Sequence, residues 1–433
     1  MDKRDSTQPS CAQYPWLKGL LFIGFISGLS LALRWQALEF LFHPWQRGAG
    51  YDFFHYYATL EALKSALANI YDPSLMYPFS SYLSAGMWQI CDNHPLPFYL
   101  LYLPFSQWPF KEAYLAHNLW QYLSYLAALL LLSLNFLRPY SPRGAWITWG
   151  VLGLASLGWG PLLDSLWLGQ VSGLYLLALS LVLVGAYRRQ DAYCGLGLAL
   201  AILLKLYPLF LALWLVVHKR YRALGWTAGS LLLLSMAAAL QWGGERFLQY
   251  VHYLLWQQPY QTVISNQSLM ALLNNLLIGC PPALIKFLNL LLLGGGGYLL
   301  WRRSQRSAKE ITELKGAEEG LAWGVDFSRW LVLSLILSPL SWGHHHLILI
   351  IPFLIFLAQT WLKGTALSFK SGEAWLWGAL WIIDGESFHN PSTRGLIIWL
   401  FSYKFILVLL LLLEARLWPL QWSDLKDKLL GKE

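Results

Sequence analysis

The residues of this chain that could do chemistry are few, and they lie where apolar segments begin, end or break. Asp52 follows the first apolar segment, within the run Gly-Tyr-Asp-Phe-Phe-His-Tyr-Tyr over 50–57. A carboxylate held among aromatic rings can act as a general base. It can equally cap the helix that the following residues predict, by accepting hydrogen bonds from free backbone amides. Both interpretations of Asp52 remain open from the sequence.

Lys205 lies in the middle of an apolar segment, three residues before Pro208. A charge at such a position is costly and usually faces a cavity or a partner. Snorkelling of the side chain to a membrane surface is the alternative, but the neighbouring basic residues are far away along the chain. We therefore expect Lys205 to bind an anionic phosphate that a lipid brings in.

Three consecutive histidines, His344, His345 and His346, precede a late apolar segment. Neighbouring residues on a helix point about 100° apart, so these three do not converge on one metal ion, and no carboxylate follows at helical spacing. We predict no metal site. The histidines are either interfacial side chains or hydrogen-bond partners of a phosphate or a sugar hydroxyl.

Two further polar pairs border apolar segments. Gly169 and Gln170 precede a predicted span, either as a plain loop or as a close backbone approach to a ligand. Asn266 and Gln267 stand beside an apolar stretch too short to span, and with Ser268 they also match an N-glycosylation acceptor. We retain Gln170, Asn266 and Gln267 as candidate binding residues.

The composition excludes a soluble domain. The 433 residues are 57% hydrophobic and only 12% charged, against roughly 25% charged in soluble domains. The net charge of +8 does not indicate nucleic acid, because the basic residues stand in short runs between apolar segments, as the positive-inside rule describes. The four cysteines have no metal-ligand spacing.

We therefore predict an all-α polytopic membrane protein, with residues 1–433 forming a single integral membrane domain of about 10–12 transmembrane or re-entrant helices. Residues 192–217 form either two half-helices that meet at Lys205–Pro208 or one kinked span. The predicted spans are 17–41, 112–137, 144–164, 172–187, 221–241, 282–301, 327–342, 345–362 and 395–415, with 366–384 as a shorter candidate.

The basic runs orient these spans and place both chain termini in the cytoplasm. Residues 42–94 then form the first extracytoplasmic loop, with an amphipathic surface helix over 53–69. The proline-rich stretch 95–108 predicts a re-entrant or broken helix, and 302–326 a cytoplasmic loop. The candidate polar residues gather on the extracytoplasmic side.

The order of these motifs resembles glycosyltransferase family 87. An Asp-Phe pair with tyrosines comes first, then Tyr-Asp-Pro, a proline-broken segment, Gly-Gln, Lys-x-x-Pro, Asn-Gln-Ser and Ser-Pro-x-Ser-Trp-x-His-His. The resemblance covers residues from about 15 to 360. Family 87 comprises polyprenol-phosphate-mannose-dependent α-mannosyltransferases of the GT-C superfamily, so the resemblance implies a membrane glycosyltransferase of that fold.

The resemblance also implies roles for particular residues. Asp52 matches the proposed base of the family, Lys205 the lysine of its Lys-x-x-Pro break, and His344 and His345 its paired histidines. We expect no cofactor, a polyprenyl-phosphate sugar as donor, and a glycolipid or polysaccharide acceptor, at a bacterial plasma membrane. The residues that we expect on the donor are Lys205, His344, His345, His346, Gln170, Asn266, Gln267, Tyr56 and Tyr57, and those on the acceptor side are His55 and His94.

Two alternatives compete with an enzyme. A secondary transporter would also use broken helices and an intramembrane lysine, but the sequence has no matching halves. A lipid-binding scaffold would use the same polar residues only structurally. The run His-Pro-Leu-Pro over 94–97 departs from the Tyr-Pro-Pro of the family, which bears on the identity of the substrate.

Overall fold

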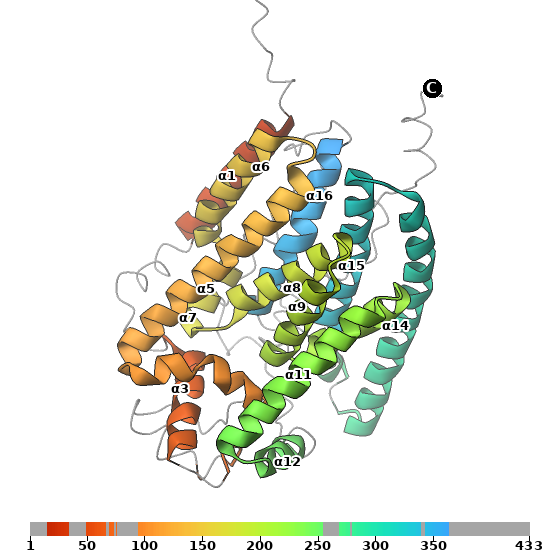
Figure 1. Ribbon diagram of the computed structural model, residues 1–433. Helices are drawn as coiled ribbons and strands as arrows, with labels where there is room; N and C mark the ends of the chain where they lie inside the picture. The colour runs from red at the N-terminus through yellow and green to blue at the C-terminus, as the bar shows by residue number, and fades with distance from the viewer. Residues whose placement is uncertain are drawn as a thin grey trace, which may run out of the picture.

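The structure is a bundle of helices. A computed structural model describes residues 15–33, 49–65, 69–72, 75, 94–253, 268–277, 279–338 and 343–362, and these residues contain helices, turns and connections without a β-strand. The predicted spans 366–384 and 395–415 lie outside the described residues. Figure 1 shows the long helices running roughly side by side, so the chain is an all-α polytopic membrane protein, as predicted.

Four described helices are long and apolar enough to cross a membrane. They are Phe110–Leu137, Tyr221–Trp242, Pro282–Glu313 and Gly343–Leu362. The first joins α5 (Phe110–Leu132) to a π-helical turn, and the last joins the 3₁₀ helix η8 (Gly343–Leu349) to α16 (Ile350–Leu362). The second and third are α11 and α14. A helix satisfies its own backbone polar groups, which is why such apolar runs become helices in lipid.

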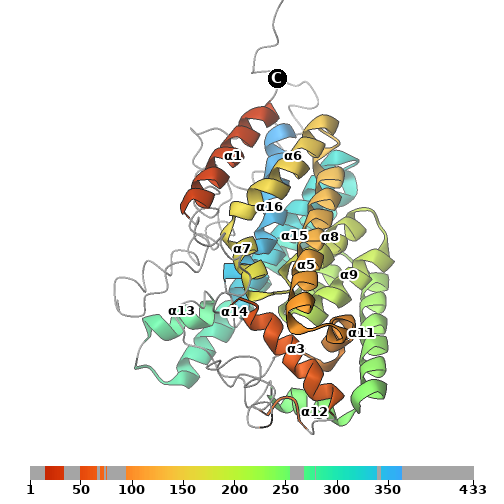
Figure 2. The ribbon, with the colours of Figure 1, turned by 90° about the vertical axis from the view of Figure 1, so that its left-hand side faces the viewer.

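The predicted span 144–164 is wrong as a single helix. The chain forms α6 (Pro142–Ala155), a short 3₁₀ turn and then α7 (Gly160–Leu168), with a bend of 65° between them. Pro161 stands at the start of α7, where its missing N–H costs no hydrogen bond but ends the preceding helix. Figure 2 shows α7 below α6, and Gln170 comes between α7 and α8 (Ser172–Tyr187) along the chain.

Residues 191–217 form a broken hairpin of two half-helices, one of the two arrangements that we predicted for residues 192–217. α9 (Asp191–Leu204) ends at Lys205, and η6 (Tyr207–Leu209) and α10 (Phe210–Val217) follow. The two ends of the segment meet, because the Arg220 guanidinium lies 3.1 Å from the Asp191 carboxylate and also donates to the Ala186 carbonyl at 2.9 Å. The segment therefore enters and returns to the same end of the bundle, rather than crossing as one kinked span.

The predicted loop 302–326 is helical. α14 (Pro282–Glu313) continues to residue 313, and α15 (Ala317–Leu337) begins four residues later, with Gly316 in the left-handed region at φ 64° between them. The density of charge in this stretch suggested a loop. Charged side chains are compatible with a helix, however, because helical hydrogen bonds involve only the backbone.

The helix after the first span is also different from the prediction. α3 (Tyr51–Lys64) begins earlier than expected and is mostly buried instead of lying on a surface. Its rings pack against the short 3₁₀ helices η2 (Leu96–Leu101) and η3 (Leu103–Gln107), which form the broken segment predicted over 95–108. The remaining described helices are α1 (Pro15–Leu33), α12 (Glu245–His252) and α13 (Leu269–Leu276), the last being too short to span, as expected.

Candidate functional site

The amide of Gln170 joins the two charged residues that the sequence singled out. Its Nε2 donates to Asp52 Oδ2 at 2.5 Å, and its Oε1 accepts from Lys205 Nζ at 3.1 Å. A carboxylate only accepts and an ammonium only donates, so these two partners fix the orientation of the amide. Tyr56 Oη lies 3.4 Å from the same Oε1. Gln170 is buried, so a low dielectric strengthens these interactions.

Asp52 does not cap its helix. Gly50, which has no side chain, is the N-cap residue of α3, and Asp52 stands in the first turn with its carboxylate toward Gln170. The backbone N–H of Gly50 donates to the Trp167 carbonyl at 2.6 Å, which ties the start of α3 to the end of α7. The capping interpretation of Asp52 is therefore wrong, and the carboxylate is aimed into the site.

Lys205 lies at the point where the broken hairpin turns. Its backbone is extended, with φ −150° and ψ 132°, so the helical hydrogen bonds stop at α9. The carbonyl of Leu204 lies 3.1 Å from His94 Nε2, which must donate to it because a carbonyl only accepts. His94, stacked on Phe98 with ring centroids 3.9 Å apart, thus stabilises the break beneath Lys205. The expected role of His94 on the acceptor side stays a prediction.

The three histidines lie on η8 and are all buried, which contradicts an interfacial position. His344 lies close enough to Lys205 and His346 for their charges to act on it. Its ring is 4.5 Å from that of His345, which in turn lies 5.9 Å from Tyr207 of η6. Within the part of the chain that the structure describes, neither ring nitrogen of His344 has a hydrogen-bond partner. The structure thus brings this cluster to the Lys205 break.

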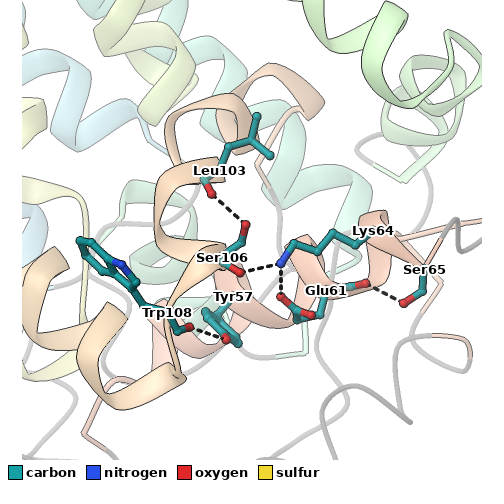
Figure 3. A network of polar contacts seen from close by, with 7 residues as sticks. All are labelled: Tyr57, Glu61, Lys64, Ser65, Leu103, Ser106 and Trp108. Atoms are coloured by element: carbon teal, nitrogen blue, oxygen red, sulfur yellow. Dashed lines mark hydrogen bonds and ion pairs between the residues drawn. The ribbon is translucent and has the colours of Figure 1, made fainter.

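Tyr57 connects helices instead of facing Gln170. Its hydroxyl donates to the Trp108 carbonyl at 2.8 Å, and Lys64 donates to the Ser106 carbonyl at 2.6 Å and to Glu61 at 2.9 Å (Figure 3). Burial, with the nearby charge of Glu61, raises the pKa of the Tyr57 phenol, so it stays a neutral donor. These bonds hold α3 against η3. Tyr57 therefore stabilises the position of Asp52 through α3, and its expected role on the donor stays a prediction.

His55 lies one turn after Asp52 on α3 and is buried among rings. Its ring meets those of Tyr51 and Phe54 edge-on, at 4.9 and 5.7 Å. The expected role on the acceptor side stays a prediction. Asn266 and Gln267 lie outside the described residues. No group of three metal-ligating side chains occurs among the residues that the structure describes.

The sequence analysis missed His117, a buried histidine of α5 that contacts the backbone carbonyl of Gln170. His117 is fully buried on α5, its Nε2 lies 3.3 Å from the Gln170 carbonyl, and its Nδ1 lies 3.4 Å from Tyr102 Oη. The carbonyl only accepts, so Nε2 carries a proton and donates to it, and the Tyr102 hydroxyl can donate to Nδ1. A single histidine in an apolar segment carries no signal of this kind, because its partners come from segments distant along the chain.

Gly169 allows the chain before Gln170 to approach Phe53 of α3 closely. Its replacement by alanine should therefore disturb the site. Gly169 has φ +71°, and an added Cβ would lie 2.5 Å from Phe53 Cβ. The left-handed conformation alone costs a residue with a Cβ roughly 1–2 kcal/mol. We expect Gly169→Ala to lower the thermal unfolding temperature and to reduce activity, because Gln170 follows directly.

Gly150→Ala is the matched control for this change. Gly150 lies within helix α6 and has no neighbour within 4 Å of an added Cβ, so alanine should keep or raise stability. Equal unfolding temperatures for the two variants would contradict the close approach at Gly169.

The fold and the site together define an integral membrane protein with a carboxylate and an ammonium held by one buried amide. The sequence profile of glycosyltransferase family 87 matches residues 93–317, more than half of the chain. The chain therefore belongs to glycosyltransferase family 87 and is a membrane glycosyltransferase. Comparisons with curated proteins and with solved structures find no match.

The matched residues contain only part of the site. Gln170, Lys205 and His94 lie within 93–317, whereas Asp52 and His344 lie outside it. The match is also shorter than the range 15–360 over which the motifs showed a resemblance. The structure nevertheless connects the outer residues to the matched part, through the Asp52–Gln170 hydrogen bond and the proximity of His344 to Lys205.

Proposed function

We propose that this glycosyltransferase moves a sugar, expected to be mannose, from a polyprenyl-phosphate donor to an acceptor hydroxyl with inversion at the anomeric carbon. The observation that carries the proposal is the Asp52–Gln170–Lys205 connection. The Gln170 side chain bonds both the Asp52 carboxylate, which can take a proton, and the Lys205 ammonium, which can bind an anion. An inverting displacement needs these two functions on opposite sides of one carbon.

Asp52 acts as the general base in this mechanism. The acceptor oxygen attacks the anomeric carbon, its proton passes to the Asp52 carboxylate, and the bond between that carbon and the phosphate oxygen breaks. The electron pair of the broken bond stays on the polyprenyl phosphate. The Gln170 amide holds one carboxylate oxygen by its hydrogen bond, which orients the carboxylate toward the hydroxyl.

Lys205 and His344 bind the phosphate that leaves. An ammonium at the break of a membrane hairpin stabilises the negative charge that develops on the leaving oxygen, because charge stabilisation is strong where water is excluded. His344 adds a buried ring whose two nitrogens have no hydrogen-bond partner among the described residues. Both groups suit a phosphate carried on a lipid, which reaches them from within the bilayer.

The distribution of charge supports an extracytoplasmic site. Arg188 and Arg189 follow the end of α8 that is remote from Gln170, because the 16 residues of this helix span about 24 Å at 1.5 Å per residue. Arg220, just before α11, donates to the Ala186 carbonyl at the same end of α8. Basic residues mark the cytoplasmic side. We therefore propose cytoplasmic termini, an active site on the other face and a bacterial plasma membrane, with a glycolipid or polysaccharide as acceptor.

Transfer of a radiolabelled sugar by the full-length chain in lipid vesicles tests this function. We expect label from polyprenyl-phosphate mannose to enter the acceptor fraction, with release of polyprenyl phosphate, and no transfer from a nucleotide sugar. The same assay with polyprenyl-phosphate glucose and arabinose tests the sugar. Movement of the intact donor across the vesicle without cleavage would instead indicate a transporter, and binding without either would indicate a scaffold.

A further inference from the structure

Two buried phenols lie against each other beside the Lys205 break. Tyr175 stands in the first turn of α8 and is 2% exposed, and Tyr207 begins η6 and is 9% exposed. Their ring centroids are 5.7 Å apart, with an angle of 74° between the ring planes. The two hydroxyls lie close enough to act on each other, and neither has a further hydrogen-bond partner among the residues that the structure describes.

The pair of phenols has one hydrogen-bond donor that the described residues leave unused. Each hydroxyl can donate one hydrogen bond, so when one phenol donates to the other, the second O–H still has no acceptor. Buried polar groups in native proteins nearly always have a partner, and the interior of a bilayer offers no water as a substitute. The pair therefore points to a ligand that accepts a hydrogen bond.

Tyr207 is the member of the pair that lies nearer to the charged residues of the site. It follows Lys205 by two residues at the turn of the broken hairpin, and its ring centroid is 5.9 Å from that of His345 on η8. Tyr175 is the more buried of the two. The Tyr175 hydroxyl can then donate to Tyr207 Oη, and a hydroxyl that accepts a hydrogen bond becomes a stronger donor itself.

The surroundings of Tyr207 favour an anion as the acceptor. The charge of Lys205 acts on His344, and neither ring nitrogen of His344 has a hydrogen-bond partner among the described residues. A phosphate has several oxygens that accept, so it can take bonds from an ammonium, an imidazole and a phenol at once, and such charge-assisted bonds are strong. A sugar hydroxyl also accepts, but it has no charge to offset that of Lys205.

We propose that Tyr207 donates a hydrogen bond to the phosphate of the lipid donor, and that Tyr175 is a positioning residue that donates to Tyr207. This inference rests on the proposed function, because it requires a lipid phosphate beside Lys205. A neutral phenol stabilises the charge on the leaving oxygen without adding a further positive charge to the interior of the membrane.

The experiment measures binding to the full-length chain in detergent, after removal of co-purified lipid. Polyprenyl phosphate, polyprenol and inorganic phosphate are titrated separately, and native mass spectrometry gives the dissociation constants. We expect Tyr207→Phe to weaken binding of polyprenyl phosphate about tenfold, as for loss of one hydrogen bond to a charged group. It should leave binding of polyprenol unchanged, because this alcohol has no phosphate. Inorganic phosphate, which has no apolar chain, should bind far more weakly than polyprenyl phosphate.

Tyr175→Phe tests the positioning role. We expect about threefold weaker binding of polyprenyl phosphate, as for loss of one neutral hydrogen bond. Because Tyr175 acts through Tyr207, the double variant should bind about tenfold more weakly than the native chain, as Tyr207→Phe does alone. Independent effects would multiply to about thirtyfold, and that result would overturn the positioning role of Tyr175.

Tyr140→Phe is the matched control. The Tyr140 hydroxyl donates to the Ala317 carbonyl at the start of α15, at 3.1 Å. Figure 1 shows the connection between α14 and α15 at the top of the bundle and α3 near the bottom. This variant also loses one phenol hydroxyl, so it should unfold at a lower temperature, but it should bind polyprenyl phosphate as the native chain does.

Failure of the inference differs from failure of the proposed function. If the native chain bound no polyprenyl phosphate, the proposed donor would be wrong and this inference with it. If the native chain bound polyprenyl phosphate and Tyr207→Phe bound it equally well, only the inference would be wrong. An equal loss of polyprenol binding in Tyr207→Phe, an equal loss of polyprenyl phosphate binding in Tyr140→Phe, or native binding of inorganic phosphate as tight as that of polyprenyl phosphate would also overturn it.

Discussion

Replacing Asp52 by asparagine should abolish sugar transfer while the protein stays folded. The asparagine side chain has nearly the same shape and can still accept the hydrogen bond from Gln170 Nε2. It cannot take the proton of the acceptor hydroxyl. Loss of a general base typically lowers the rate roughly 10²–10⁴-fold. The measurement is transfer of radiolabelled sugar in vesicles, together with the thermal unfolding temperature.

Glu112→Gln is the control for Asp52→Asn. Glu112 is an exposed carboxylate in the first turn of α5. Trp108, whose carbonyl accepts from Tyr57 of α3, lies just before this helix. It shares the end of the bundle with Asp52 but has no contact with Gln170, so its amide variant should keep full activity. Full activity in Asp52→Asn itself would refute the assignment of the base.

Lys205→Met should reduce sugar transfer nearly as strongly as Asp52→Asn does, because it removes the charge that stabilises the leaving phosphate. Loss of one group of this kind costs about 10²–10³-fold in rate. The protein should unfold at the same or a higher temperature, since an ammonium within an apolar hairpin is costly to bury. A fall in activity with no fall in stability separates a role in the reaction from a structural one. Single-turnover rates and thermal unfolding are the two measurements.

Lys205→Arg and Lys111→Met complete this test. Arginine keeps the charge but replaces a compact ammonium by a planar guanidinium, so we expect partial activity, between the native chain and Lys205→Met. Lys111 is exposed beside Glu112, and its methionine variant should behave as the native chain. If Lys205→Met transferred sugar normally, the phosphate would have to be bound elsewhere.

The positions of several helices could be predicted from the sequence. The spans expected at 112–137, 172–187 and 221–241 differ from the observed helices by no more than two residues at either end. Each is a long apolar run, and in lipid its backbone N–H and C=O groups can form hydrogen bonds only within the segment, as in a helix. The break at Lys205 was also predictable, because Pro208 removes a donor within such a run.

The errors in the fold have two kinds of cause. The bend before α7 and the continuation of α14 to Glu313 have local causes, Pro161 and the compatibility of charged side chains with a helix, whereas the burial of α3 depends on what packs against it. An amphipathic pattern does not say whether rings such as those of Phe53 meet lipid headgroups or other rings. In the structure they meet Phe105 and Tyr102 of the broken segment, so α3 is part of the core.

The sequence by itself determined that this chain lies in a membrane, that Asp52, Lys205 and the histidines are the exceptional polar residues, and that Lys205 stands at a break. These follow from local composition, because charge is costly in lipid wherever the chain folds. Only the tertiary structure decided that Gln170 joins Asp52 to Lys205, across 118 and 35 residues of chain. A hydrogen bond needs its partners within about 3 Å, and only the packing of α3, α8 and α9 sets that distance.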